Sequence, residues 1–524
     1  MPLGERAVRA FDEAIARLGG DPGREELRLA LAQASASIEV PMRVAVVGRI
    51  KAGKSTLLNA LLGEEIAATG VEELTFNVNW FVHGERPSLV IHFKDGREPR
   101  PEPLGALHRL ANRSEDNAEL LRSIRHVEVR YPQEILTRLQ LIDTPGFGSF
   151  FDQDSRNTLE FLGMSADDID ASTRNHAAGA DAVLFLFARN LAASEQELVS
   201  DFQGAAIGDF TPVNAIAVLT KVDAYWSPDE PDHDPLTTGE RVAGRIADEP
   251  GVDRLFHAVL PVCGLLAAGA ATLTPADVAG LESLAKAPPD VLARRLRYAE
   301  RFATRDYPDL PVPAAEREPL LRKLGQYGIW VAAEAVRAGT SDPDALRAAL
   351  LDRSGLPRLN GLVLSHFGNR ATVIKSAGAV NRSRAACRQA LRDLSGIDAD
   401  AVAAASGRLE EFEVREHDVV ELGLLRALYR DPNRLGLTPD EAAELLTVTG
   451  EDGPSCGRRL GLDPCACPDE MLEAATARLR YWRRREGGFG LSSRTAHAVR
   501  TVVRSYERIA YHVREAKRHL EFDA

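Results

Sequence analysis

The 524-residue chain has little lysine: 8 lysines stand against 56 arginines. Ordinary positive charge is therefore carried by arginine, and a lysine can mark a position that needs a compact ammonium group. Three of the eight, Lys51, Lys54 and Lys221, fall inside the nucleotide motifs described below.

Cysteine is also sparse, with only five residues. An odd number of cysteines in a long chain argues against a disulfide scaffold and favours a reducing cytosol. Three of them lie in the segment CGRRLGLDPCAC, which has no second paired spacing and no nearby histidine, so we expect ordinary thiols there rather than a zinc site. The five are Cys263, Cys387, Cys456, Cys465 and Cys467.

Long hydrophobic runs are rare. The longest, 255–273, approaches the length of a membrane span but contains His257 and Pro261. A strand followed by a helix explains it better. The N-terminus is charged too early for a signal peptide, so we expect a cytoplasmic protein, or one peripheral to the inner face of the cell membrane.

The net charge of −13 is unevenly distributed. Residues 471–524 hold 12 Lys and Arg against 6 Asp and Glu, which makes this tail +6 and leaves −19 for the rest. An anionic partner is therefore expected to meet the tail.

Hydrophobic periodicity divides the chain into three parts. Residues 1–40 predict two amphipathic helices, and 286–524 read almost entirely as helices. Between them, 41–285 alternates apolar strands with helical or loop segments, which predicts an α/β domain with a mostly parallel sheet. We expect the N-terminal helices to pack on an all-α bundle or stalk formed by 286–524. The expected strands are RVAVVG, FNVNWFV, SLVIHF, HVEVRY, LQLID, AVLFLF, AIAVLT and HAVLPV.

The strongest motif is G-x-x-x-x-G-K-S at residues 48–55, placed after an apolar strand and before a helix. In such a P-loop, backbone N–H groups surround phosphates, Lys54 lies between the β- and γ-phosphates, and the Ser55 hydroxyl binds Mg²⁺. The expected nucleotide-binding residues of this loop are Gly48, Arg49, Ile50, Lys51, Ala52, Gly53, Lys54, Ser55 and Thr56.

A second motif, LIDTPG, ends another apolar strand. Asp143 is placed to reach the Mg²⁺ shell, and Gly146 can present its N–H to the γ-phosphate. A threonine between the P-loop and Asp143 should complete the metal site and sense the γ-phosphate. Thr69 and Thr75 are the candidates, and Thr75 is favoured because it directly precedes a strand. The predicted Mg²⁺ ligands are thus Ser55, Thr75 and Asp143.

The third motif, T-K-x-D, covers Thr220, Lys221 and Asp223. A carboxylate here can accept both N1–H and N2–H₂ of guanine, whereas adenine offers no matching donors. The Lys221 stem can lie over the purine. The nucleotide is therefore expected to be GTP, with the backbone at Cys263 and Gly264 supporting the base.

With GRIKAGKST, Thr75, DTPG and TKVD in place, the sequence resembles the dynamin superfamily of large GTPases, in its bacterial dynamin-like branch. Asp143 lies 88 residues beyond Ser55, far more than in small GTPases. The resemblance implies a GTPase domain with a helical stalk, hydrolysis of GTP to GDP and phosphate with Mg²⁺, and a homodimer through the GTPase faces or a related dynamin-like partner. Phe147 stands where small GTPases carry a water-orienting Gln.

The resemblance also suggests a role for Lys51. Dynamins commonly have Ser at this position and use a monovalent cation, whereas guanylate-binding proteins in the same superfamily place an Arg finger there. Lys51 resembles the second arrangement, and a solvated lysine is the alternative. The expected catalytic set is Lys51, Lys54, Ser55 and Thr75.

The tail segment TARLRYWRRREGG, with Trp482 and the arginines of 478–485, is the candidate contact with an anionic membrane. A solvated helix face or a subunit contact is the alternative, and nucleic acid is not the expected partner. The rival function is a regulatory or RNA-associated P-loop GTPase switch without membrane remodelling. A third, a scaffold with a degenerate nucleotide site, conflicts with the intact motifs.

Overall fold

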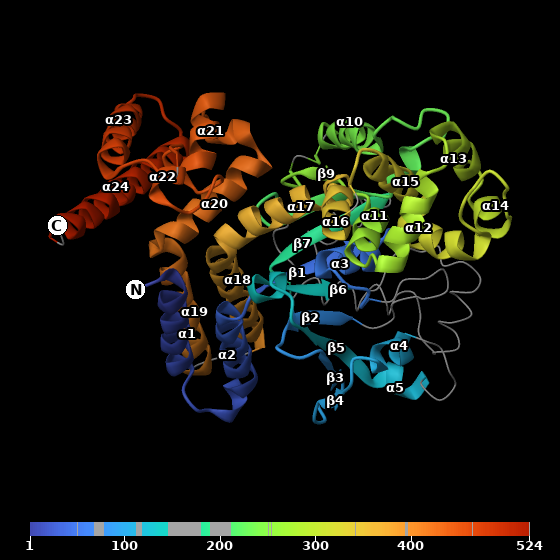
Figure 1. Cartoon of the computed structure of the whole chain (residues 1–524). Helices are drawn as coiled ribbons and strands as arrows, with labels where there is room; N and C mark the ends of the chain where they lie inside the picture. The colour runs from blue at the N-terminus through green and yellow to red at the C-terminus, as the bar shows by residue number, and fades with distance from the viewer. Residues whose placement is uncertain are drawn as a thin grey trace. The chain divides into compact units, whose positions relative to one another are not determined.

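The computed structural model describes residues 1–49, 51–67, 78–111, 118–144, 180–188, 211–249, 251–252, 254–340, 342–393, 397–463 and 465–522 (Figure 1). Within these ranges the chain forms two compact units. One, the sheet unit, consists of Arg43–Phe210 and Ala215–Leu362. The other, the helical unit, consists of Met1–Met42, Thr211–Asn214 and Val363–Ala524.

The described strands of the sheet unit form one nine-stranded sheet in the order β4-β3-β5-β2-β6-β1-β7-β8-β9. The pairs β1–β7, β7–β8, β8–β9 and β2–β5 are parallel, whereas β2–β6, β3–β5 and β3–β4 are antiparallel. The strands are β1 (Met42–Gly48), β2 (Asn79–His83), β3 (Ser88–Phe93), β4 (Arg100–Glu102), β5 (Ile124–Tyr131), β6 (Leu139–Asp143), β7 (Ala182–Ala188), β8 (Ala215–Thr220) and β9 (Val259–Pro261).

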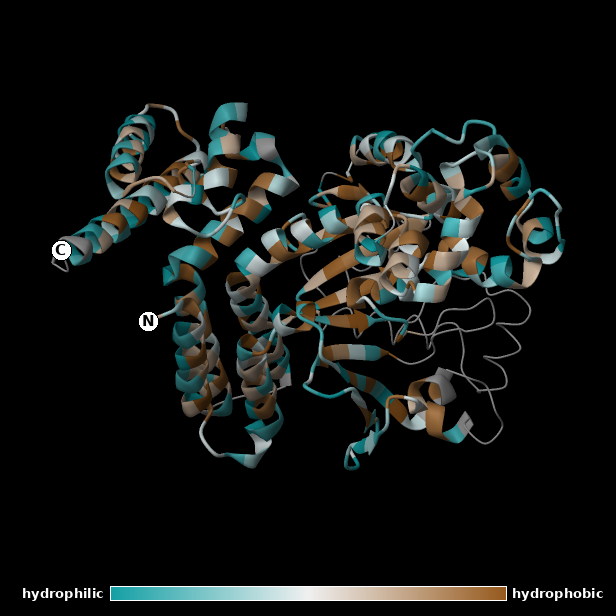
Figure 2. Ribbon diagram, in the orientation of Figure 1, coloured by the Kyte–Doolittle hydropathy of each residue, from teal (hydrophilic) through white to brown (hydrophobic). Residues whose placement is uncertain are grey.

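The α/β fold class is confirmed, and all eight expected strands are present. Strands β7 and β8 are continuous apolar runs (Figure 2). All of their residues except the half-buried Ala188 are buried, as expected for strands covered on both faces. The sheet is more mixed than "mostly parallel" implies, because its β2–β4 side contains the antiparallel pairs. Strand β4 was not expected, since RPE is short, charged and contains proline.

Helices flank the sheet and extend the unit to Leu362. We expected this domain to end near residue 285, but Leu292, Leu320 and Leu346 belong to the same apolar core as Phe185 and Leu219 of the sheet. The helical segments are α3 (Lys54–Leu62), α4 (Ala106–Ala111), α5 (Ala118–Ser123), α6 (Ile135–Arg138), η3 (Val222–Tyr225), α10 (Pro235–Ala247), α11 (Gly264–Ala271), α12 (Pro275–Ala285), α13 (Pro289–Leu296), α14 (Ala299–Thr304), α15 (Ala314–Arg337), α16 (Pro343–Asp352) and α17 (Leu356–Leu362).

In the helical unit, α1 packs against α19, and α2 packs against α18. The third and longest stretch of this unit begins with a π-helical turn, Val363–Gly368. Its helical segments are α1 (Leu3–Leu18), η1 (Pro22–Arg24), α2 (Glu25–Glu39), η4 (Val363–Gly368), α18 (Asn369–Asp393), α19 (Ile397–Arg415), α20 (His417–Arg430), η5 (Pro432–Leu435), α21 (Pro439–Val448), α22 (Cys456–Arg459), α23 (Pro468–Glu486) and α24 (Ser493–Phe522).

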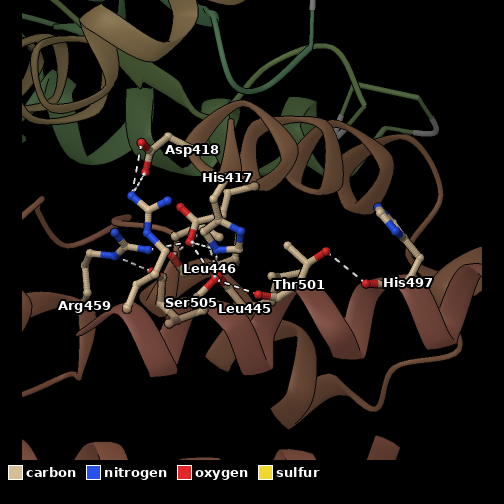
Figure 3. Close-up of polar contacts among 12 residues, drawn as sticks. His417, Asp418, Leu445, Leu446, Arg459, His497, Thr501 and Ser505 are labelled. Atoms are coloured by element: carbon tan, nitrogen blue, oxygen red, sulfur yellow. Dashed lines mark hydrogen bonds and ion pairs between the residues drawn. The ribbon is translucent and has the colours of Figure 1, made fainter. Parts of the chain in front are cut away.

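A buried polar network joins α20, α22 and α24 (Figure 3). The Glu421 carboxylate accepts hydrogen bonds from Ser505 and Arg459, each at 2.6 Å, and lies 3.1 Å from His417 Nε2. His417 Nε2 also lies 2.9 Å from the Ser505 hydroxyl. The network fixes how these three helices meet inside the unit.

Within the described ranges, no single helix has the length and apolar character to cross a membrane. The two consecutive helices α11 and α12 together meet those criteria but are bent by 118°.

Candidate nucleotide site

The P-loop joins β1 to α3, and two glycines make its path possible. A Cβ on Gly48 would lie 2.4 Å from the carbonyl oxygen of Leu186 on β7, so no larger residue fits at that position. Gly53 has φ +92° directly before the first residue of α3, a conformation that glycine adopts without strain. Together they place the N-terminus of α3 beside the end of β1, an arrangement suited to binding phosphates.

Lys54 is 8% exposed, and its ammonium donates hydrogen bonds to the carbonyl oxygens of Gly48 and Arg49, both at 3.1 Å. Burial lowers the pKa of Lys54 to about 8, and the nearby Asp143 carboxylate opposes that change. The ammonium is thus held inside the loop that would surround a β- and γ-phosphate.

Asp143, the last residue of β6, is 1% exposed. Burial raises its pKa to about 7, and the Lys54 ammonium and a hydrogen bond from Asn79 oppose the rise. Its Oδ1 atom is buried and has no hydrogen-bond partner among the described residues. A buried carboxylate oxygen of this kind fits an Mg²⁺ site, because it needs a cation or a cation-bound water to compensate its burial.

Mg²⁺ would be held here by Ser55 and Asp143 with the nucleotide phosphates. When bound, it would neutralise charge that develops on the phosphates. Ser55 is half-buried in the first turn of α3.

Two buried threonine hydroxyls connect the motifs. Thr144 donates to the Val46 carbonyl on β1 at 2.8 Å. The Thr220 hydroxyl lies 2.7 Å from the carbonyl oxygen of Ala52 in the P-loop and 3.1 Å from that of Phe187. The end of β8 is therefore tied directly to the P-loop.

The guanine motif follows β8. Lys221 adopts a left-handed conformation, φ 57°, which begins the short helix η3 and carries the chain to Asp223. Burial raises the pKa of Asp223, and hydrogen bonds from its own backbone N–H and from the Cys263 thiol oppose that rise only in part.

The Cys263–Gly264 turn comes from the end of β9 and the start of α11. The Cys263 N–H donates to the Ser354 carbonyl at 2.8 Å. A Cβ on Gly264 would lie 3.6 Å from Thr56 Cγ2 of α3. The structure thus brings Cys263 beside Asp223 and Gly264 beside the P-loop helix.

Two further residues of the P-loop are described by the structure. Lys51 is exposed and has φ 62°, and Arg49 is half-buried at the end of β1. The predictions for Ile50, Thr69, Thr75, Gly146 and Phe147 lie outside the described residues.

Sequence reasoning missed two residues. Asn79 contacts Asp143, and Ser354 fixes Cys263, although neither belongs to a motif. The only available signal was an asparagine inside an apolar strand pattern, which strand propensity does not favour.

Several side chains of the basic tail segment make contacts inside the protein. Trp482 is fully buried, and its indole N–H donates to Glu444 at 2.8 Å, so the expectation that this ring faces a membrane is wrong. The pattern R-Y-W-R could not reveal that the tryptophan fills the core between α21, α23 and α24. Three arginines of the segment pair with acids: Arg478 with Glu444, Arg483 with Glu507 and Arg485 with Glu441.

The cysteines are free thiols. Cys263 and Cys387 are buried, Cys456 is half-buried, and Cys465 and Cys467 are exposed. Cys467 serves as the residue before α23, where its N–H donates to Glu470 at 2.8 Å.

Comparison with known proteins assigns the chain to the family that its nucleotide-binding motifs resemble. Residues 44–222 match the model described as the dynamin family. Isoniazid-induced protein IniC of Mycobacterium tuberculosis is 33% identical over 514 residues, which cover 97% of this chain and 98% of that protein.

More distant matches are shorter or weaker. The bacterial dynamin-like protein of Nostoc punctiforme is 25% identical over 167 residues, 29% of this chain and 23% of that protein. A solved structure described as an oligomerised bacterial dynamin pair, providing a mechanism for long-range sensing and tethering of membranes, aligns with 98% of this chain and 91% of its own. Its identity is 11% and its TM-score 0.33, too low to bear on the site.

Proposed function

Because the chain belongs to the dynamin family of GTPases, in its bacterial dynamin-like branch, we propose that it hydrolyses GTP to GDP and phosphate with Mg²⁺ and couples this reaction to dimerisation at an anionic membrane. The observation that carries the GTPase part is the buried Asp143 oxygen without a partner among the described residues, beside the buried Lys54. The two charges compensate each other only in part, since burial still lowers the pKa of Lys54 and raises that of Asp143, and a bound nucleotide and cation would supply the remaining compensation.

In this proposal, each motif residue has a role in binding the phosphates, the Mg²⁺ ion or the base. Lys54 and the N-terminus of α3 bind the phosphates, and Ser55, Thr75 and Asp143 hold Mg²⁺. Asp223 selects guanine, with Lys221 over the base and the Cys263–Gly264 turn beneath it. Gly146 contacts the γ-phosphate, and Lys51 approaches the bridge between the β- and γ-phosphates.

Dimerisation through the GTPase face is tested by turnover against protein concentration. We expect GTP turnover per molecule to rise with concentration and with anionic liposomes. A slow rate that is independent of both would instead support a regulatory switch that acts without assembling.

The membrane part is supported by the turn between α23 and α24. Phe489 is fully exposed between Gly488 and Gly490, an unusual position for an aromatic side chain. Arg480, Arg484 and Arg494 near this turn are exposed. Residues 478–500 contain seven arginines and a single acid, Glu486.

Arg494 adds a further argument. It lies in the first turn of α24, where the helix dipole disfavours a cation. Helix stability therefore does not explain the presence of an arginine at this position. We propose that Phe489 enters the interfacial layer of the bilayer while these arginines contact anionic headgroups. Each arginine near such a surface contributes about 1 kcal/mol.

Cosedimentation with liposomes rich in phosphatidylserine tests this surface. Phe489→Ser and the reversal of Arg480, Arg484 and Arg494 to Glu should each reduce binding without changing basal GTP turnover. Arg485 is avoided because its partner Glu441 is 3% exposed and their separation would disturb the fold. Tyr298→Ser, an exposed aromatic of the sheet unit, is the matched control. Wild-type protein that stays in the supernatant at low salt would rule this surface out.

A further inference from the structure

Strands β2 and β6 run antiparallel, and their register sets Asn79 directly opposite Asp143. Residues directly opposite in an antiparallel pair have their side chains on the same face and in contact. Both side chains are buried, with Asn79 9% and Asp143 1% exposed. The Asn79 amide lies close enough to the Asp143 carboxylate to lower the pKa of that group.

This contact distinguishes the two oxygens of Asp143. Oδ1 is buried and has no hydrogen-bond partner among the described residues, which leaves the other oxygen as the one that the Asn79 amide can hold. A carboxylate held at one oxygen has a fixed orientation, and its second oxygen points in one direction. Groups that orient a metal ligand in this way commonly determine how tightly the metal binds.

The stability of strand β2 does not explain why an asparagine occupies position 79. Asn is depleted in strands, and a buried amide must find partners to offset its desolvation. An apolar residue would fill the same buried position without that desolvation cost.

We propose that Asn79 is a positioning residue for the magnesium ion of this GTPase: its amide holds one oxygen of Asp143 and so aims the other at the cation. The proposal rests on the proposed function, because it requires that a guanine nucleotide and Mg²⁺ bind here. Asn79 itself touches neither nucleotide nor metal.

The test is the Mg²⁺ dependence of nucleotide binding, measured with full-length protein and a fluorescent GDP. Affinity is titrated over a range of Mg²⁺ concentrations and again with a chelator. Asn79→Ala removes the amide. Asn79→Leu removes it while keeping the volume, which guards against a variant that fails to fold. His83→Ala, on the same strand and the same face but at its exposed end, is the matched control.

In both Asn79 variants, the Mg²⁺ concentration that gives half of the affinity gain should rise about ten-fold to a hundred-fold. Affinity in the presence of chelator should stay at the wild-type value, which a merely structural defect would lower. His83→Ala should match the wild type in both measurements.

The experiment distinguishes failure of the positioning role of Asn79 from failure of the proposed function. If the wild type binds GDP with a Mg²⁺ dependence that the Asn79 variants share, the positioning role is overturned and the proposed function stands. If the wild type shows no GDP binding, or binding that Mg²⁺ does not change, the proposed function itself fails.

Discussion

The hydroxyl of Thr220 lies 2.7 Å from the carbonyl oxygen of Ala52, so the T-K-x-D motif directly contacts the P-loop. Thr220 is 5% exposed. The contact is therefore shielded from water, which could not replace the hydroxyl if it were removed.

Thr220→Val should weaken nucleotide binding. Removing one buried hydrogen bond costs about 1 kcal/mol and leaves the Ala52 carbonyl without that donor, so GDP affinity should fall roughly five- to ten-fold. Thr220→Ser keeps the hydroxyl and is the control. Titration with a fluorescent GDP measures the effect. Wild-type affinity in Thr220→Val would show that the two motifs are held together by other contacts.

Much of the fold was predictable because strands buried on both faces read as unbroken apolar runs. AVLFLF and AIAVLT became β7 and β8, and LQLID became β6 with Asp143 at its end. The extent of the sheet unit was harder. Leu320 and Leu346 have the helical spacing of a bundle, and only tertiary packing assigns them to the core beneath the sheet.

In the candidate site, too, the residues of sequence motifs could be predicted, whereas residues that act through tertiary contacts could not. Motif residues such as Gly48 and Lys54 were predictable because phosphate chemistry requires them at fixed spacing. Asn79 acts through its register with Asp143, and Ser354 through a carbonyl brought to Cys263 from far along the chain. Such contacts depend on the fold and leave no local pattern. Trp482 was misjudged for the same reason, since burial of a tryptophan among arginines is decided by neighbouring helices.

Asp223→Asn should exchange guanine for xanthine. The carboxylate accepts from N1–H and N2–H₂ of guanine, whereas an amide can donate to the carbonyl that xanthine has in place of the amino group. A site built on such a pair can discriminate by about 10⁴-fold, so GDP affinity should collapse and xanthosine diphosphate should bind. The exposed Asp232→Asn is the control. If the wild type binds GDP and ADP equally, Asp223 does not select the base.

Glu421 should make stability depend on acid pH. Burial would raise its pKa, but His417, Arg459 and Ser505 more than offset this, and the pKa is lowered from 4.5. A lowered pKa in the folded state adds stability that is complete above the unfolded value of 4.5 and is lost as pH falls through the folded value.

Glu421→Gln, which removes the charge, should therefore lower stability near neutral pH by about 2 kcal/mol. The difference in thermal midpoint between wild type and variant should narrow as pH falls below 4.5, the ordinary glutamate value. Thermal denaturation of the full chain across this range measures it. Glu411→Gln, a half-exposed glutamate of α19, is the control. A gap that stays constant with pH would mean that the charge of Glu421 is not what stabilises the network.

Lys51 and Lys221 are the only non-glycine residues with positive φ in the described part of the chain, at 62° and 57°. A left-handed conformation costs a residue with a side chain about 1–2 kcal/mol, and glycine adopts it freely. Because strained residues gather at functional sites, the conformation of Lys51 makes its side chain a candidate for a role in the reaction.

The variant Lys51→Gly distinguishes a catalytic role of the Lys51 side chain from an effect on the stability of the fold. Glycine relieves the strain, so the thermal midpoint should stay level or rise, and nucleotide affinity should remain close to wild type. If the ammonium acts as a finger on the bridge between the phosphates, GTP turnover should nevertheless fall by about 10³- to 10⁵-fold. Wild-type turnover should be insensitive to exchanging potassium for sodium, and Lys51→Ser should regain some activity in potassium alone. The exposed Lys94→Ala is the control. Undiminished turnover in Lys51→Gly, at concentrations where the protein dimerises, would leave this ammonium without a catalytic role.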